Sequence, residues 1–151
     1  MSSKYERYSA WISSLYHDIQ RIERMEMGKF GLKGPYAQCL LAISRFPEGV
    51  AAARLAEECE KDKAAISRTL AELIQNGLVL RNTGYRGTIT LTEKGREAAE
   101  TVSRQGELAV ELAGEGLTEE EKRTCYRVLG HIAENLHALC KTGLNHKEET
   151  K

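Results

Sequence analysis

Long hydrophobic runs are absent from this 151-residue sequence, in which the longest unbroken apolar stretch is Cys39–Ile43. A membrane-spanning helix needs about 20 mostly apolar residues, and a secretory signal needs an apolar region of about 7–15 residues. The sequence therefore predicts neither feature, and we expect a cytoplasmic protein with no membrane partner. With 41% hydrophobic and 29% charged residues, the composition is that of a single globular domain spanning residues 1–151.

Cysteine is scarce, and the spacing of the four cysteines excludes a Cys-x-x-Cys motif, so we expect no structural metal site. Cys39 lies in the apolar run and Cys59 follows two glutamates, which predicts that neither thiol is activated. The pattern favours buried, reduced thiols for the set as a whole. Redox sensing through one of them stays open as an alternative. The cysteines are Cys39, Cys59, Cys125 and Cys140.

Motifs for catalysis are also missing, since the sequence has no Gly-x-Ser-x-Gly, no phosphate-binding loop and no His-Glu-x-x-His. His17 and Asp18 are adjacent, but neighbours on a helix point about 100° apart and do not form a dyad. We therefore expect neither an enzyme nor a cofactor.

Net charge is zero for the whole chain, but positive charge is concentrated in one segment. Residues 61–96 carry seven basic and three acidic side chains, a net charge of +4, whereas residues 97–151 have a net charge of −4. Local potential governs phosphate binding more than the total charge does. The basic segment is therefore the candidate nucleic-acid contact.

Apolar periodicity predicts helices over 5–25, 36–46 and 51–60. The first helix has one apolar seam, which can pack on its own domain or on a second copy; its members are Tyr8, Ile12, Leu15, Ile19 and Ile22. A glycine-rich turn over 28–35 follows it, and Pro35 suits the first turn of the next helix.

A further helix is predicted over 62–76, with Asp62 as its N-cap and Gly77 as its left-handed terminator. Its inner face consists of Ile66, Leu70, Leu73 and Ile74. Two strands, 78–80 and 88–91, then flank a turn over 83–87. Thr92 begins a long helix to about 113, and a capping box of Thr118 and Glu121 begins the last helix.

Two short helices followed by a hairpin indicate a winged helix-turn-helix, so the predicted class is mainly α (α+β). The second helix of this motif enters the major groove, and the sequence predicts donors and small residues there: Lys61, Lys63, Ala64, Ala65, Ser67 and Arg68. The hairpin adds Arg81, Tyr85 and Arg86 for phosphates and the minor groove. The alternative for Arg68 is a surface ion pair with Glu72, one turn away.

These residues resemble the multiple-antibiotic-resistance regulator (MarR) family of bacterial transcriptional regulators. The resemblance lies in Asp62–Leu70 and Leu73, in Asn76-Gly77-Leu78-Val79, and in Ile89-Thr90-Leu91-Thr92-Glu93-Lys94-Gly95. One departure is the wing tip, Thr83–Gly87, which is shorter than usual and lacks the aspartate that helps to hold the family's wing arginine.

The resemblance implies a homodimer that represses transcription from a pseudo-palindromic operator in double-stranded DNA. Residues 1–33 and 92–151 would be the dimerisation helices, and residues 34–91 the DNA-binding module. It also implies a small-molecule effector, for which Tyr16, His17 and Tyr36 are the candidate contacts. A winged-helix protein–protein interaction module is the alternative that never touches DNA.

Overall fold

The computed structural model describes residues 3–29, 31, 36–84 and 87–144, beginning with a 25-residue helix, α1 (Lys4–Gly28). Ser3 and Glu6 form a capping box at its start, in which each side chain accepts from the other residue's backbone N–H, at 2.6 and 3.0 Å. The helix predicted over 5–25 is thus confirmed and runs three residues further, through the buried Met27. The predicted role of Pro35 falls outside the described residues.

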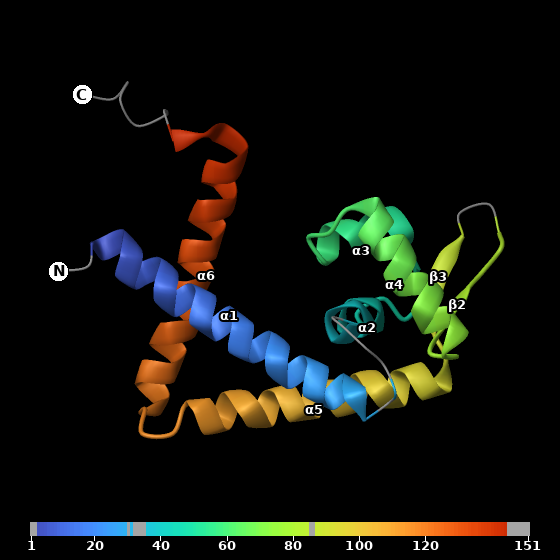
Figure 1. Cartoon of the computed structure of the whole chain (residues 1–151), viewed down its shortest axis with the longest axis horizontal. Helices are drawn as coiled ribbons and strands as arrows, with labels where there is room; N and C mark the ends of the chain where they lie inside the picture. Colours follow the sequence, from blue (N-terminus) through green and yellow to red (C-terminus); the bar gives the residue numbers. More distant parts are fainter. Residues whose placement is uncertain (1–2, 30, 32–35, 85–86, 145–151) are drawn as a thin grey trace. The chain divides into compact units, whose positions relative to one another are not determined.

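The winged helix-turn-helix predicted over 34–91 follows α1 (Figure 1). Its elements are α2 (Tyr36–Ser44), β1 (Val50–Ala51), α3 (Ala52–Glu58), α4 (Lys63–Gln75), β2 (Val79–Arg81) and β3 (Thr88–Leu91). The strands form an antiparallel sheet in the order β1-β3-β2. Strand β1 was not predicted, because a strand of two residues is too short to show alternation.

Both ends of α4 lie where the sequence placed them. The Asp62 carboxylate accepts from the Ala65 N–H at 2.7 Å, which confirms the N-cap. At the other end Gly77 has φ +70°, its N–H bonds the Ile74 carbonyl, and the Leu78 N–H bonds the Leu73 carbonyl. That pair of bonds is a Schellman motif, so the chain leaves α4 abruptly and enters the wing.

The inner face of α4 is shifted by one position from the prediction. Ile66, Leu70 and Leu73 are buried as expected, but Ile74 is 39% exposed and Thr69 is buried in its place. The prediction for Ile74 was wrong because the contacts of α4 centre on the 66-69-70-73 stripe, which leaves Ile74 at its margin.

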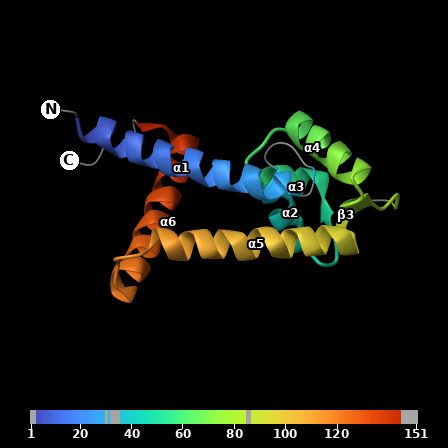
Figure 2. The ribbon, with the colours of Figure 1, turned by 60° about the horizontal axis from the view of Figure 1, so that its bottom comes forward.

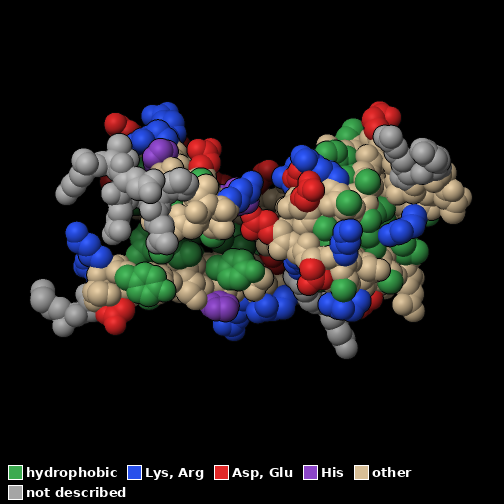
Figure 3. Space-filling model, turned by 90° about the horizontal axis from the view of Figure 1, so that it is seen from above, with side chains coloured by type: hydrophobic (Ala, Val, Ile, Leu, Met, Phe, Trp, Pro, Cys, Tyr) green, Lys and Arg blue, Asp and Glu red, His purple; other side chains and the backbone are tan. Residues whose placement is uncertain are grey.

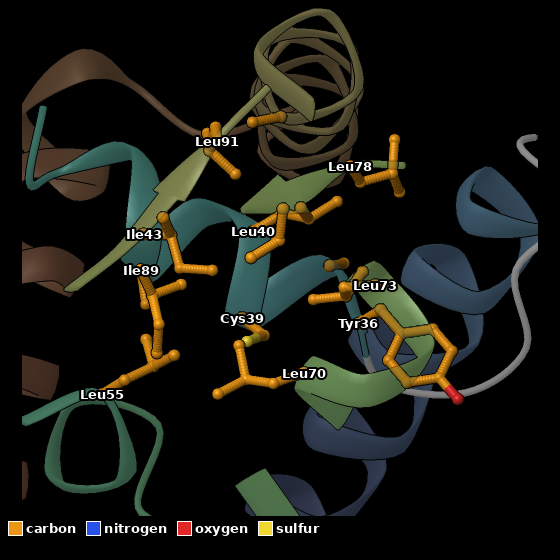
Figure 4. Close-up of a cluster of buried hydrophobic side chains, with 14 of the residues drawn as sticks. Tyr36, Cys39, Leu40, Ile43, Leu55, Leu70, Leu73, Leu78, Ile89 and Leu91 are labelled. Carbon is orange, nitrogen blue, oxygen red and sulfur yellow. The ribbon is translucent and has the colours of Figure 1, made fainter. Parts of the chain in front are cut away.

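The hydrophobic core lies around α2, which buries six of its nine residues. Figure 4 shows side chains from α2, α3, α4 and β3 meeting in this cluster, among them Leu40, Leu55, Leu70 and Ile89. In Figures 1 and 2, α2 lies between α4 and the first half of α5 (Glu93–Ala113). This arrangement leaves the outer face of α4 uncovered by the rest of the module.

Helix α5 begins where predicted, and Thr92 joins it to the end of α4. The Thr92 hydroxyl donates to the Gly77 carbonyl at 2.7 Å and accepts from the Gly95 N–H at 3.0 Å. Gly95 is buried against the backbone of Leu78, where an added Cβ would stand 1.9 Å from the carbonyl oxygen. No side chain fits there, so glycine is required for α5 to approach the wing.

Residues 1–109 form one compact unit and residues 110–151 a second, which contains α6 (Glu119–Thr142). The predicted capping box is confirmed: the Glu121 N–H donates to Thr118 Oγ1 at 3.2 Å and the Thr118 N–H to Glu121 Oε2 at 2.8 Å. No residue of α6 is buried in the structure, and its apolar side chains Val128, Leu129 and Leu136 are exposed. In the described ranges, no helix is both long and apolar enough to cross a membrane.

Candidate nucleic-acid interface

The outer face of α4 carries the side chains that the sequence predicted for DNA contact. Lys63, Ala64, Ser67 and Arg68 are exposed, and Ala65 is half-buried behind the Asp62 cap. Ala64 keeps the start of the helix narrow, while the lysine, serine and arginine are hydrogen-bond donors. In Figure 3, Lys and Arg side chains are visible on the side of the winged-helix module that faces the viewer. A helix with this profile can approach a groove closely and bond bases or phosphates.

Glu72, the acidic residue nearest in helical spacing to Arg68, is engaged elsewhere. The Tyr36 side chain, from α2, lies close enough to Glu72 for the carboxylate to act on its hydroxyl. Burial and this carboxylate raise the pKa of Tyr36 to about 12, and Figure 4 shows its hydroxyl pointing out of the apolar cluster. Among the described residues Arg68 takes part in no ion pair. The Arg68–Glu72 alternative from the sequence is therefore not what the structure contains.

The base of the wing is closed by Asn82 and Thr88. The Asn82 backbone N–H donates to the Thr88 carbonyl at 2.8 Å, and its side-chain amide lies 3.2 Å from Thr88 Oγ1. Arg81 is exposed at the end of β2, beside this closure. The contribution of Asn82, whose backbone and side chain both bond Thr88, was not predicted from the sequence. Tyr85 and Arg86 lie outside the described residues, so their predicted roles remain predictions.

Lys61 differs from the other predicted basic contacts. It is half-buried in the turn between α3 and α4, and its positive charge lowers the pKa values of Glu23 and Cys59. For Glu23 the larger effect is burial, which raises the pKa, while a hydrogen bond from Gln38 lowers it. The charge of Lys61 thus acts on one group of α1 and on one just after α3, which the sequence did not indicate.

The three predicted ligand contacts are not equivalent. Tyr16 and His17 are exposed on α1 with ring centroids 6.0 Å apart, and the Tyr16 hydroxyl accepts from Gln20 at 2.8 Å. Tyr36 is buried, 7% exposed, in α2. A pocket of about 480 Å³ lies where α2, β3 and α5 meet, and none of the three lines it. Its lining includes Leu41, Phe46, Pro47, Leu91, Arg96 and Glu100.

Two of the four cysteines act on one another, although they stand 20 residues apart in the sequence. Cys39 is buried in α2, and Cys59 is half-buried at the end of α3, against the same core. The Cys39 thiol, together with Lys61 and Arg45, lowers the pKa of Cys59 to about 7 in spite of burial and Glu58. The Cys59 thiol and burial raise the pKa of Cys39. The expectation that both thiols are unactivated therefore fails for Cys59, because Cys39 and the two cations lower its pKa more than burial and Glu58 raise it.

The fold is shared with solved structures of known family. A transcriptional regulator from Methanosarcina mazei Go1, described as MarR, superposes with a TM-score of 0.83 at 21% identity, covering 92% of this chain and 94% of that one. A MarR family regulator from Rhodococcus sp. RHA1 gives 0.76 at 20% identity, over 88% and 98%. MepR from S. aureus, solved with DNA, gives 0.76 at 18% identity, over 89% and 99%.

At sequence level, residues 30–84 match the family model described as MarR family. That segment contains α2, α3, α4 and β2, the elements that build the candidate interface. The comparison with curated proteins found no match. Residues 30–84, from α2 to β2, thus match the MarR family in sequence, and the chain shares its fold with solved regulators that are described as MarR.

Proposed function

We propose that this chain binds double-stranded DNA sequence-specifically as a homodimer and represses transcription. The observation that carries the proposal is the uncovered outer face of α4, where Arg68 is exposed and takes part in no ion pair among the described residues. The crystal structure of the MepR–DNA complex supports the proposal, since MepR has a similar fold and binds DNA.

In this proposal α4 lies in the major groove, with Lys63, Ala64 and Ser67 nearest the base edges. Arg68 follows on the same face, where its guanidinium can donate two hydrogen bonds to guanine O6 and N7. Arg81, with Arg86 beyond it, contacts phosphates or the minor groove from the wing. The module supplies the local positive charge, so the neutral net charge of the chain does not oppose binding.

The homodimer is supported by the apolar seam of α1. Its five members are between 38% and 54% exposed, and Figure 3 shows hydrophobic side chains exposed along this helix; the members are Tyr8, Ile12, Leu15, Ile19 and Ile22. A contiguous apolar stripe on a helix indicates a binding surface. A second copy covering it would pair two winged modules, whose half-sites would lie about 10 base pairs apart on one side of the duplex.

Release from DNA by a small ligand is the last part of the proposal. The pocket of about 480 Å³ between α2, β3 and α5 is large enough for a small organic molecule, and Arg96 in its lining offers a cation for an acidic group. A ligand here would contact both the module and α5. It would shift the position of α4 if it bound more tightly when the module is placed away from DNA than when it is placed on DNA.

The testing experiment is a titration of binding against salt on the duplex upstream of the chain's own coding region, with a scrambled duplex alongside. The proposal predicts tighter binding to the first duplex and a steep fall of affinity with salt, because phosphate contacts release counterions. The rival interaction module predicts no change in DNA retention when Lys63 and Arg68 are neutralised. A footprint confined to one half-site would contradict the dimer.

A further inference from the structure

The pocket where α2, β3 and α5 meet has two walls of different chemistry. The wall formed by α2, the turn after it and the end of β3 is mostly apolar, with Leu41, Ile43, Phe46, Pro47 and Leu91. The α5 wall carries two charged side chains, Arg96 and Glu100. All of these residues belong to the same compact unit, residues 1–109. One wall can therefore receive an apolar group, while the other can receive charged groups.

The two charges on the α5 wall are opposite in sign, and no ion pair neutralises them. Among the described residues, neither Arg96 nor Glu100 takes part in a salt bridge. They stand four residues apart, so their Cβ atoms are neighbours on the helix surface, about 5–6 Å apart. In the described part of the chain no other charged side chain lines the pocket. The lining thus offers one cation and one anion side by side.

This distribution selects against a ligand with a single charge. A carboxylate alone would be attracted by Arg96 and repelled by Glu100, and an ammonium group alone would meet the reverse. A zwitterion satisfies both side chains. Its carboxylate accepts charge-assisted hydrogen bonds from a guanidinium, and its ammonium group donates them to a carboxylate.

We propose that this pocket binds a small zwitterion with an apolar body, of the kind represented by an aromatic α-amino acid. Arg96 binds the carboxylate, Glu100 binds the ammonium group, and the ring lies against Phe46 and Pro47. The two charged groups of an α-amino acid share one carbon atom, which matches two side chains one helical turn apart. A pocket of about 480 Å³ is of the size that holds such a molecule. The assignment deepens the ligand release proposed above, because it names the class of ligand.

Arg96 also connects the pocket to the end of α4. Its Nη1 donates to the carbonyl of Leu91, the last residue of β3, at 3.2 Å. The next residue, Thr92, donates from its N–H to the Leu78 carbonyl at 3.0 Å and from its hydroxyl to the Gly77 carbonyl at 2.7 Å. Gly77 and Leu78 are the residues through which the chain leaves α4.

A bound carboxylate competes with the Leu91 carbonyl for the Arg96 guanidinium, and the charged acceptor is the stronger one. Loss of the bond to Leu91 loosens the junction of β3 and α5, to which the end of α4 is tied. Occupancy of the pocket therefore lowers affinity for DNA. This consequence rests on the DNA-binding function proposed above, whereas the class of ligand does not.

The first test measures ligand binding without DNA, by calorimetry on the full chain. The three probes share a phenyl ring: L-phenylalanine has both charges, 3-phenylpropanoate lacks the ammonium group, and 2-phenylethylamine lacks the carboxylate. Phenylalanine should bind at least tenfold more tightly than either of the other two. A probe with one charge that binds as tightly as phenylalanine would overturn the assignment, and so would the absence of phenylalanine binding.

Charge-removing variants assign each end of the ligand to one side chain. Arg96→Gln should lower affinity for phenylalanine at least tenfold and raise affinity for 2-phenylethylamine, while Glu100→Gln should raise affinity for 3-phenylpropanoate. A gain of affinity for one probe cannot come from loss of the fold. Arg104→Gln and Glu97→Gln are the matched controls, because both residues are exposed on α5 outside the lining. Equal changes in the controls would show a general effect of net charge and overturn the site.

The second test measures affinity for the duplex upstream of the coding region, with and without saturating phenylalanine. The ligand should lower affinity at least fivefold in the natural chain and in Arg104→Gln, and should have no effect in Arg96→Gln. Selective binding of phenylalanine with unchanged DNA affinity would overturn the link to α4. If the chain fails to bind DNA in either condition but binds phenylalanine selectively, the DNA-binding function is refuted and the ligand site stands.

Discussion

The Tyr36 hydroxyl of α2 faces the Glu72 carboxylate of α4, which lies one helical turn from Arg68. Tyr36→Phe removes the hydroxyl and releases Glu72, which then stands one helical turn from Arg68 and free to pair with it. We expect DNA affinity to fall several-fold in Tyr36→Phe. In the Tyr36→Phe/Glu72→Gln double variant the loss should disappear, because no carboxylate competes with the phosphates. A loss that persists in the double variant would show that Tyr36 acts through packing alone.

The same pair predicts a response to alkaline pH. Burial and Glu72 raise the pKa of Tyr36 from the ordinary 10 to about 12, so the fold prefers the protonated phenol. The stabilisation is fully present below pH 10 and is lost as the pH rises through about 12. Unfolding in urea across this window should show a steeper fall in stability for the natural chain than for Tyr36→Phe. Parallel curves would contradict the assignment.

Arg68→Ala tests the interface directly. Loss of a guanidinium at a base edge should weaken binding to the cognate duplex by about 1–3 kcal/mol and relax preference at one base pair. Arg104→Ala is the matched control, because Arg104 is exposed on α5, outside the module, where it donates to Thr101. Band-shift titrations on the cognate duplex and on single-base variants distinguish the outcomes. Equal weakening on all sequences would make Arg68 a phosphate contact instead.

Gly95→Ala should destabilise the module, because the new Cβ would stand 1.9 Å from the Leu78 carbonyl oxygen. Relief needs a backbone shift, for which we expect a cost of about 1–3 kcal/mol. Gly106→Ala lies in the same helix with no atom within 4 Å of the added Cβ. It should raise stability by about 0.5–1 kcal/mol through helix propensity. Urea unfolding gives the free energy of unfolding of both variants. A loss of similar size in both would refute the steric explanation.

Leu15→Glu tests the apolar seam of α1. Leu15 is 54% exposed in the single chain, so a buried charge is created only if a partner covers it. We expect the dimer dissociation constant to rise at least about tenfold, a change of about 1.4 kcal/mol, in sedimentation experiments. Ser14→Glu, on the adjacent exposed position of the helix, is the control. An unchanged association state in Leu15→Glu would remove the seam from the interface.

The two ends of α4 follow from local sequence signals. Asp62 and Gly77 end α4 where they were expected to, since a capping carboxylate and a left-handed glycine act on residues within one turn. Strand β1 was missed for the opposite reason: two residues carry no period, and Val50 is a strand residue only because Ile89 pairs with it. The exposure of Ile74 likewise depends on the arrangement of the helices around α4.

In the candidate DNA interface, too, some features follow from the sequence and others depend on tertiary packing. The sequence alone determined that Lys63, Ser67 and Arg68 face outward from α4. The helical period places them opposite the apolar stripe, which is buried. Only the tertiary structure decided the partners of Glu72 and Cys59. Tyr36 is 36 residues from Glu72, and Cys39 is 20 residues from Cys59. Contacts at such separations come from helix packing, and a carboxylate or thiol takes its chemistry from whichever group packing places beside it.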